Sequence, residues 1–257
     1  MSGAALKAKR VALVTGGASG IGREICLALA AAGRRVAVAD VQAVAAAETS
    51  AMIEAAGGDA MSVTIDVTST AAVDAGYEEI AAGWGPVEIL VNVAGWDAMM
   101  QFVDTDEDFW DRIIDLNFKG MLRTTHRCLP AMLDAGWGRV VNVASDAGRV
   151  GSSLEAVYSG AKGGTIAFTK SLAREVARRG ITANVVCPGP TDTALLDEIV
   201  SASPDGERVI NAMAGAVPMK RIGRPEEIAS AVVYFASEGS GFTTGQTLSV
   251  SGGLTMA

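Results

Sequence analysis

The sequence predicts a doubly wound α/β fold, with seven parallel strands in one sheet, helices on both faces, and a single domain. Short runs rich in β-branched residues alternate with longer Ala- and Leu-rich stretches along almost all of the 257 residues. The short runs are continuously apolar rather than alternating in polarity, which is typical of parallel strands covered on both faces. No Pro- or Ser-rich linker divides the chain, so the alternation belongs to one sheet with right-handed crossovers.

The expected elements follow this alternation in order. We expect strands at Arg10–Val14, Arg35–Asp40, Ala60–Asp66, Val87–Val93, Arg139–Ala144, Thr182–Cys187 and Gln246–Val250. Helices are expected at about 20–32, 42–56, 70–82, 106–135, 155–179 and 225–236. The alternation breaks once, at about 190–224, where the sequence predicts an amphipathic helical piece flanked by glycines and prolines. We expect a mobile cover over a substrate there, with an ordinary insertion as the alternative.

Composition and charge exclude several classes of function. The net charge is −8 and no basic stripe is present, so neither nucleic acid nor an acidic membrane is an expected partner. No stretch is apolar for long enough to span a bilayer, and no signal-peptide pattern is seen. The three cysteines, Cys26, Cys128 and Cys187, are far apart, which favours reduced thiols in a cytoplasmic protein.

Metal and hydrolase chemistry is also disfavoured. His126 is the one histidine, which argues against a Ser-His-Asp triad and most transition-metal centres. The acidic run that begins at Asp104 resembles the start of a calcium loop, but Phe109 occupies the position that requires glycine. We therefore expect no metal.

A glycine-rich turn and one aspartate predict a dinucleotide site. The segment Thr15–Gly22 follows the first strand and opens a helix, whose free N–H groups suit a pyrophosphate. Its spacing, G-x-x-x-G-x-G, differs from the standard fingerprint, so the turn alone is weak evidence. Asp40 ends the second strand, where a carboxylate binds ribose hydroxyls and repels a 2′-phosphate. Neither Ser19 nor Val41 offers a positive charge, so NAD is favoured over NADP.

A second constellation predicts acid–base chemistry. Tyr158 and Lys162 are four residues apart on one helical face, and Ser145 lies 13 residues upstream of Tyr158, just after a strand. A nearby ammonium favours the phenolate, which makes Tyr158 a candidate base, while Ser145 could hold the same substrate oxygen.

Taken in order, these motifs resemble the classical short-chain dehydrogenase/reductase family over essentially the whole chain. The resemblance implies catalytic roles for Asn117, Ser145, Tyr158 and Lys162. It implies cofactor contacts from Gly16, Ser19, Gly20, Ile21, Gly22, Asp40, Asp66, Val67, Asn92, Ala94, Gly95, Tyr158, Lys162, Pro188, Gly189, Thr191 and Thr193. In this reading Asn92 lines the adenosine side, and Asn117 anchors a water chain to Lys162. One departure is clear, since Val93 stands where the family has a second Asn.

Several strings around these motifs resemble the 2-hydroxycyclohexane-1-carboxyl-CoA dehydrogenases of cyclic and aromatic carboxylate degradation. They are AGWD at 94–97, RVGSS at 149–153, EAVY at 155–158, VVCPGPTDTALL at 185–196 and LSVSGGLTM at 248–256. The resemblance implies a cyclic 2-hydroxyacyl-CoA substrate. We expect the substrate pocket to include Trp96, Ala147, Arg149 and Leu195, with Arg149 either steering an acyl-CoA or lying on the surface.

Alternatives remain open at this point. The same chemistry would serve a free cyclic or aryl secondary alcohol, or a 3-oxoacyl chain, and a binding protein that senses NAD without turnover is the non-enzyme alternative. The stretches 106–135 and 155–179 carry apolar residues on several faces, among them Phe109, Trp110, Ile113, Ile166, Phe168 and Leu172. Family members pair these two helices between subunits, so we expect a homotetramer.

Overall fold

The computed structural model describes residues 9–201 and 206–256, without the side chains of Leu195, Asp197, Glu198, Ile199 and Glu207. The strands are β1 (Val11–Thr15), β2 (Arg35–Asp40), β3 (Asp59–Thr64), β4 (Ile89–Asn92), β5 (Gly138–Val143), β6 (Ile181–Pro188) and β7 (Thr247–Val250). They form one parallel sheet in the order β3-β2-β1-β4-β5-β6-β7. The predicted seven-stranded parallel sheet is therefore confirmed.

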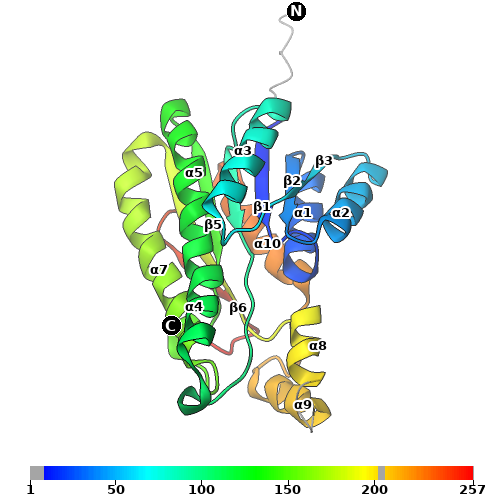
Figure 1. The fold of residues 1–257 in the computed structure, drawn as a ribbon, viewed down its shortest axis with the longest axis vertical. Helices are drawn as coiled ribbons and strands as arrows, with labels where there is room; N and C mark the ends of the chain where they lie inside the picture. Colours follow the sequence, from blue (N-terminus) through cyan, green and yellow to red (C-terminus); the bar gives the residue numbers. More distant parts are fainter. Residues whose placement is uncertain (1–8, 202–205, 257) are drawn as a thin grey trace, which may run out of the picture.

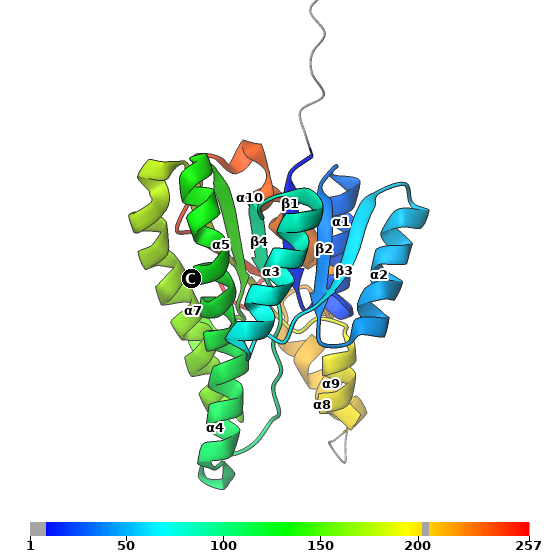
Figure 2. The ribbon, with the colours of Figure 1, turned by 45° about the horizontal axis from the view of Figure 1, so that its top comes forward.

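The helices occupy the stretches between strands. They are α1 (Gly20–Ala31), α2 (Ala43–Ala55), α3 (Thr70–Trp84), α4 (Glu107–Ile114), α5 (Gly120–Ala135), α6 (Ala147–Val150), α7 (Ala156–Val176), α8 (Ala194–Ser201), α9 (Gly206–Ala216) and α10 (Pro225–Ala236). The excursion near 190–224 thus contains two helices, α8 and α9. They lie with α4 at one end of the sheet (Figures 1 and 2).

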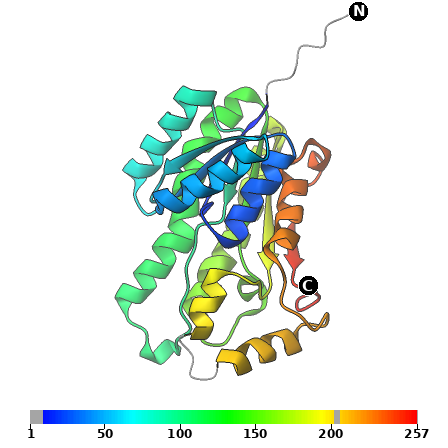
Figure 3. The same cartoon turned by 90° about the vertical axis from the view of Figure 1, so that its right-hand side faces the viewer.

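Side chains of successive strand residues go to opposite faces of the sheet and build two separate cores. In β1, Val11 and Leu13 pack with residues of α3, α5 and α7. Ala12 and Val14 pack with residues of α1, α2 and α10 on the other face. Figure 3 shows the sheet from the side, between these two layers of helices. Because both faces are covered, continuous apolar runs are what the sheet requires.

One predicted helix, 106–135, is interrupted. Asp106 accepts a hydrogen bond from Phe109 N (2.9 Å) and begins α4, but a π-helical segment at Asp115–Lys119 separates α4 from α5. Such a segment holds one extra residue in a turn and is frequent at functional sites. It changes which side chains of this stretch point toward the sheet.

The order of the strands fixes where a ligand can bind. β1 pairs with β2 on one side and with β4 on the other, so the chain changes direction across the sheet at β1. In open α/β sheets a crevice forms at this point, beyond the carboxyl ends of the strands. The loops after β1, β4, β5 and β6 all meet there.

Candidate active site

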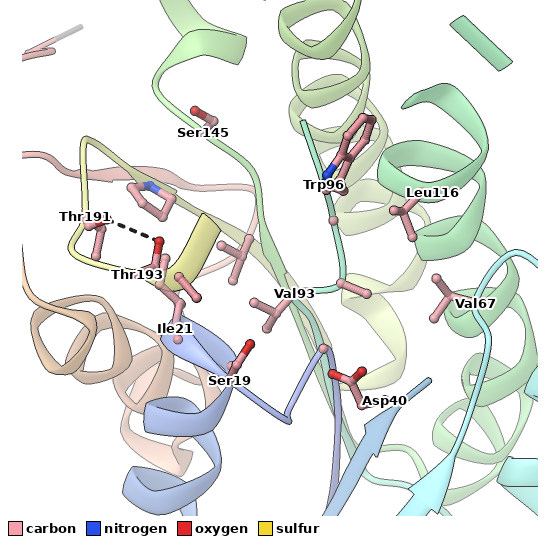
Figure 4. A pocket seen from close by; sticks show the side chains of 18 of the residues that line it. Ser19, Ile21, Asp40, Val67, Val93, Trp96, Leu116, Ser145, Thr191 and Thr193 are labelled. Atoms are coloured by element: carbon pink, nitrogen blue, oxygen red, sulfur yellow. Dashed lines mark hydrogen bonds between the residues drawn. The ribbon is translucent and has the colours of Figure 1, made fainter. Parts of the chain in front are cut away.

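A cavity of about 580 Å³ lies at the carboxyl ends of the strands. The loops after β1, β2, β3, β4, β5 and β6, together with the start of α8, form its walls (Figure 4). The predicted cofactor residues that line it are Gly16, Ser19, Gly20, Ile21, Gly22, Asp40, Asp66, Val67, Ala94, Gly95, Tyr158, Lys162, Pro188, Gly189, Thr191 and Thr193. Ser145 and Trp96 line it as well. The fold therefore brings residues from distant segments of the chain into one site.

The glycine turn after β1 is closed by backbone contact. A Cβ on Gly22 would lie 1.9 Å from the carbonyl oxygen of Gly16, so no side chain fits there. Gly16 has φ +69°, and a Cβ on it would lie 2.9 Å from the Ala94 backbone. Ser19 caps α1 without using its side chain for a cap hydrogen bond. The first N–H groups of α1 can therefore serve an anionic ligand.

Asp40 is held against this turn. Its Oδ2 accepts a hydrogen bond from Ala18 N (3.1 Å) and its Oδ1 accepts one from Gln42 N (3.0 Å). Arg23 is the nearby cation, but its guanidinium donates to Ala18 O (2.6 Å) and to Thr49 Oγ1 (3.1 Å). Arg23 is not among the residues that line the cavity. The carboxylate of Asp40 is consequently the charge that a ligand meets at this end of the site.

Asp66 and Val67 form the neighbouring wall. Asp66 Oδ1 accepts hydrogen bonds from the Thr68 N–H (2.9 Å) and hydroxyl (2.7 Å). These bonds lower the pKa of Asp66, so its carboxylate stays ionised and fixed in orientation.

Asn92 was expected on the adenosine side, but the structure buries it beneath the cavity. Its Nδ2 donates to Asn142 Oδ1 (2.8 Å) and Thr125 Oγ1 (3.2 Å), and its Oδ1 accepts from Thr124 Oγ1 (2.7 Å). Asn92 does not line the cavity. It joins β4 to β5 and α5, and so positions the loop that follows β4.

Val93, the departure from the family pattern, points into the cavity (Figure 4). The backbone here is held from below, because Thr15 Oγ1 accepts hydrogen bonds from Val93 N (3.1 Å) and Ala94 N (3.3 Å). Replacing an amide by an apolar side chain at this position thus leaves the loop anchored.

Tyr158 and Lys162 lie one turn apart on α7. Burial raises the pKa of Tyr158, the carboxylates of Asp97 and Glu155 raise it further, and a hydrogen bond with Ser145 opposes them. One side of the Tyr158 ring faces the cavity, so this residue is half-buried rather than enclosed. The phenol is therefore protonated at neutral pH in this arrangement, in contrast to the lowered pKa that the spacing of Tyr158 and Lys162 suggested.

Lys162 is buried and directed under the loop after β4. Its Nζ donates to Val143 O (3.2 Å) and lies 5.5 Å from the centre of the Tyr158 ring. Burial lowers the pKa of Lys162 to about 8, while Cys187 and Asp97 raise it. The ammonium is the main form at neutral pH.

The π-helical segment directs Asn117 toward Lys162. Asn117 Nδ2 donates to Trp96 O (2.8 Å) and Ile113 O (3.0 Å), and among the described residues its buried Oδ1 has no hydrogen-bond partner. Both Asn117 and Lys162 line a niche of about 10 Å³, roughly the space of one water molecule. An unpartnered oxygen beside an ammonium fits the water chain that the family resemblance implies.

The substrate-side expectations have mixed outcomes. Trp96 lines the cavity, and its ring packs edge-on against Phe109 at 6.3 Å. Ala147 and Arg149 do not line it. Arg149 Nη1 instead donates to Ser249 Oγ (2.6 Å), which fixes α6 to β7. The Leu195 side chain lies outside the described residues, although Ala194 and Leu196 of α8 line the cavity.

Sequence reasoning missed Arg112. Its guanidinium stacks on the Trp96 ring, 3.7 Å from the ring centre, and lines the cavity while remaining exposed. Arg112 lies one turn before Leu116, another wall residue, and this spacing on a helix was the signal that could have found it.

Thr193 closes the remaining side. Its Oγ1 accepts a hydrogen bond from Leu196 N (3.3 Å) and donates to Thr191 O (3.3 Å), so it begins α8 (Figure 4). A Cβ on Gly20 would contact Thr193 Cγ2 at 3.3 Å. The start of α8 thus lies directly over the glycine turn.

His126 is exposed on α5, and no group of three or more metal-binding side chains occurs within 9–201 and 206–256. Over the same residues, no helix is long and apolar enough to cross a bilayer. All three cysteines are free and buried.

Comparison with known proteins adds independent information. The family described as enoyl-(acyl carrier protein) reductase matches residues 16–255. An acetoacetyl-CoA reductase from Shinella zoogloeoides is 41% identical over 95% of this chain and 98% of its own. An NAD(+)-dependent 2-dehydro-3-deoxy-L-rhamnonate dehydrogenase from Sphingomonas sp. (strain SKA58) is 39% identical over 96% of each chain.

A 3-oxoacyl-[acyl-carrier-protein] reductase from Salmonella typhimurium is 38% identical over 96% of this chain and 98% of its own. Among solved structures, a tryptophan variant of an actinorhodin polyketide ketoreductase with NADPH superimposes with a TM-score of 0.92, at 36% identity. That match covers 96% of this chain and 97% of the ketoreductase.

Proposed function

The chain belongs to the short-chain dehydrogenase/reductase family of oxidoreductases, and from this premise we propose that it interconverts a secondary alcohol and a ketone with NAD. The observation that carries the proposal is one cavity that joins the glycine turn and Asp40 to Ser145, Tyr158 and Lys162. A binding protein that only senses NAD would need no acid–base pair, so the intact catalytic set favours an enzyme.

The site fits a dinucleotide by its own geometry. The backbone of the glycine turn and the N-termini of α1 and α8 would hold the phosphates, with Thr191 and Thr193 alongside. Asp40 would accept hydrogen bonds from the adenosine ribose, and Asp66 and Val67 would flank the adenine. Bound NAD would supply the hydride acceptor next to Tyr158.

In this mechanism Tyr158 moves the proton at the substrate oxygen. Ser145 donates a hydrogen bond to that oxygen and keeps it within reach of the phenol. Because the Tyr158 phenol is protonated at rest, it can donate a proton to the oxygen of a ketone during reduction. In the reverse direction, the Tyr158 phenolate accepts the hydroxyl proton of an alcohol. Lys162 would stabilise the phenolate and hold the nicotinamide ribose, and Asn117 would connect Lys162 to water in the niche that they share.

NAD rather than NADP is the proposed cofactor because of Asp40. Its carboxylate faces the cavity, and the nearby Arg23 guanidinium is already bound to backbone and hydroxyl oxygens. A 2′-phosphate would meet a negative charge without a free cation among the wall residues at that end. The polyketide ketoreductase was solved with NADPH, so the two cofactors must be compared directly.

For the substrate, we propose a cyclic 2-hydroxyacyl-CoA of the 2-hydroxycyclohexane-1-carboxyl-CoA type. The strings around Trp96 and α8 support it, and Arg112 offers an exposed cation for an anionic tail. The second candidate is a 3-oxoacyl thioester, favoured by the names of the reductases from Shinella and Salmonella. A free cyclic or aryl ketone is the third.

One experiment separates these substrates. Oxidation of NADH is followed with 2-oxocyclohexane-1-carboxyl-CoA, acetoacetyl-CoA and free cyclohexanone derivatives. We expect the cyclic thioester to give the largest kcat/KM, and Arg112→Gln to raise KM for thioesters but not for free ketones. Lys119→Gln, an exposed cation further along this stretch, is the control. A free ketone that matches the thioester would overturn the CoA assignment.

A homotetramer in a cytoplasmic setting is also proposed. Within one chain Ile113, Ile166 and Leu172 are already buried, Ile166 and Leu172 among residues of the sheet, so the apolar faces named from the sequence do not carry the proposal. Its support is the group of exposed apolar side chains near the carboxyl end: Phe242, Leu248, Leu254 and Met256. Light scattering at micromolar concentration tests it, and a monomer would refute it.

A further inference from the structure

Asp97 is a buried carboxyl that the mechanism above does not use. It follows Trp96, is 4% exposed, and among the described residues neither of its oxygens has a hydrogen-bond partner. An ionised carboxylate without a partner is costly to bury. Asp97 does not line the large cavity, so it does not touch a ligand there.

The surroundings of Asp97 are small, largely apolar and adjacent to the catalytic tyrosine. Asp97, Glu155 and Tyr158 line one niche of about 10 Å³, enough for roughly one water. The 98–105 segment and α4 contribute apolar groups and one hydroxyl to this niche: Ala98, Met100, Phe102, Thr105 and Phe109. The titratable groups that face Asp97 are therefore Glu155, Tyr158 and Lys162, all at the start of α7.

The charges in this niche are coupled. Burial raises the pKa of Asp97 to about 7, and the nearby Glu155 raises it further, while the Ala98 N–H and the ammonium of Lys162 lower it. Asp97 and Glu155 in turn raise the pKa of Tyr158, after the larger effect of burial. A buried carboxyl next to a second carboxyl is hard to ionise, so Asp97 retains its proton into the neutral range.

We propose that Asp97 and Glu155 form a proton-holding carboxyl pair that acts through Tyr158 as a positioning element of the acid–base site. When the pair releases its proton to water, its added negative charge keeps the Tyr158 phenol protonated. Tyr158 therefore remains a proton donor over a wider range of pH than its contact with Ser145 and Lys162 alone would allow. The catalytic consequence rests on the proposed function, whereas the charge coupling does not.

The coupling can be measured on the protein without substrate. Infrared difference titration should show a protonated carboxyl band that disappears near pH 7 in the wild type and is absent in Asp97→Asn. Ultraviolet titration, with Tyr158→Phe subtracted, should show the Tyr158 phenolate at lower pH in Asp97→Asn, by about one pH unit. Glu155→Gln should shift it in the same direction by less.

The control is Asp104→Asn, an exposed carboxylate on the same loop, which should change neither titration. If Asp97→Asn does not fold, as judged by circular dichroism, Glu155→Gln carries the test alone. A wild type with no protonated carboxyl at neutral pH, or an unchanged Tyr158 titration in both variants, would overturn the proposal.

Kinetics provide the second readout. In Asp97→Asn the acidic limb of kcat/KM for alcohol oxidation should move to lower pH by about one unit, and the basic limb of ketone reduction should move with it. A purely structural role would lower kcat at all pH values without moving either limb, and that result would contradict the proposal. If no alcohol is turned over, the proposed function fails while the two titrations still decide the carboxyl pair.

Discussion

Two aspartates at opposite ends of the active-site region differ in how the protein surrounds their carboxyl groups. Asp40, after β2, accepts hydrogen bonds from Ala18 N and Gln42 N, whereas Asp97, after β4, has no hydrogen-bond partner among the described residues. At the cofactor end, the backbone of the glycine turn and its free N–H groups form the binding site. At the catalytic end, the site depends on buried ionisable side chains. Substitutions at the cofactor end should therefore change the affinity for the cofactor and the choice between cofactors, whereas substitutions at the catalytic end should change the rate and its dependence on pH.

The largest effect is expected at the catalytic end. Tyr158→Phe removes the hydroxyl that moves the proton and should lower kcat by roughly 10²- to 10⁴-fold. The cofactor end is untouched, so NADH affinity should stay within about twofold, as checked by fluorescence titration. A variant with near wild-type kcat would show that Tyr158 is not the acid–base group.

The matching experiment at the cofactor end is Gly22→Ala. The added Cβ would lie 1.9 Å from Gly16 O, so the turn must open, and affinity for NADH should fall by at least about tenfold, or 1.4 kcal/mol. Gly215→Ala on α9 is the control, because a Cβ there meets nothing within 4 Å. Unchanged affinity in Gly22→Ala would mean that the turn does not hold the cofactor.

Substitution of Asp40 should change which cofactor is preferred without blocking the cofactor site. Asp40→Ala combined with Val41→Arg replaces a negative charge by a positive one, and should shift the ratio of kcat/KM for NAD to that for NADP by roughly tenfold or more toward NADP. Val41→Arg alone is the control, since it keeps the repulsive carboxylate. A wild-type enzyme that already prefers NADP would refute the role given to Asp40.

The smallest expected effect is on thermal stability, where substitutions of Asp97 and Asp40 should act in opposite directions. The raised pKa of Asp97 means that the folded protein binds its proton more tightly than the unfolded chain, so its contribution to stability is lost as pH rises from about 4 toward 7. Asp97→Asn should therefore raise the melting temperature by a few degrees at pH 8, and by less at pH 5.

Asp40→Asn should lower the melting temperature at pH 8, because the carboxylate that accepts hydrogen bonds from Ala18 N and Gln42 N is lost. Calorimetry at the two pH values measures both variants. Equal shifts of the same sign would remove the distinction between the two carboxylates.

Features that depend on neighbouring residues in the chain could be predicted from the sequence. The inner strands are buried on both faces and are largely apolar, and all seven predicted strands have ends within two residues of the observed bounds. The glycine turn was recognisable because several of its glycines allow no Cβ or need an unusual φ, and Tyr158 and Lys162 because helical spacing alone puts them on one face.

What depends on packing could not be predicted in this way. The motif predicts that Asn92 lines the cofactor site, yet its side-chain amide is fully hydrogen-bonded to Asn142, Thr124 and Thr125 from other elements. Arg149 donates a hydrogen bond to Ser249, which is 100 residues away in the sequence. In the sequence Asp97 is only the last residue of the AGWD string, and its burial beside Tyr158 depends on the approach of Glu155 and α7. The sequence did predict amphipathic helical structure within 190–224, but not the division into α8 and α9.

The π-helical segment at Asp115–Lys119 has a consequence for the helix that follows it. A π-helical turn holds one residue more than an α-helical turn, so the five residues of this segment cover about the same rotation as four residues of a regular helix, each of which advances about 100°. The helix α5 therefore keeps the direction and register it would have after an uninterrupted helix, and Thr124 still meets Asn92. The extra residue alters the path of the backbone only around Asn117, which is directed at the niche it shares with Lys162. The segment thus re-aims one side chain without turning the helix that follows.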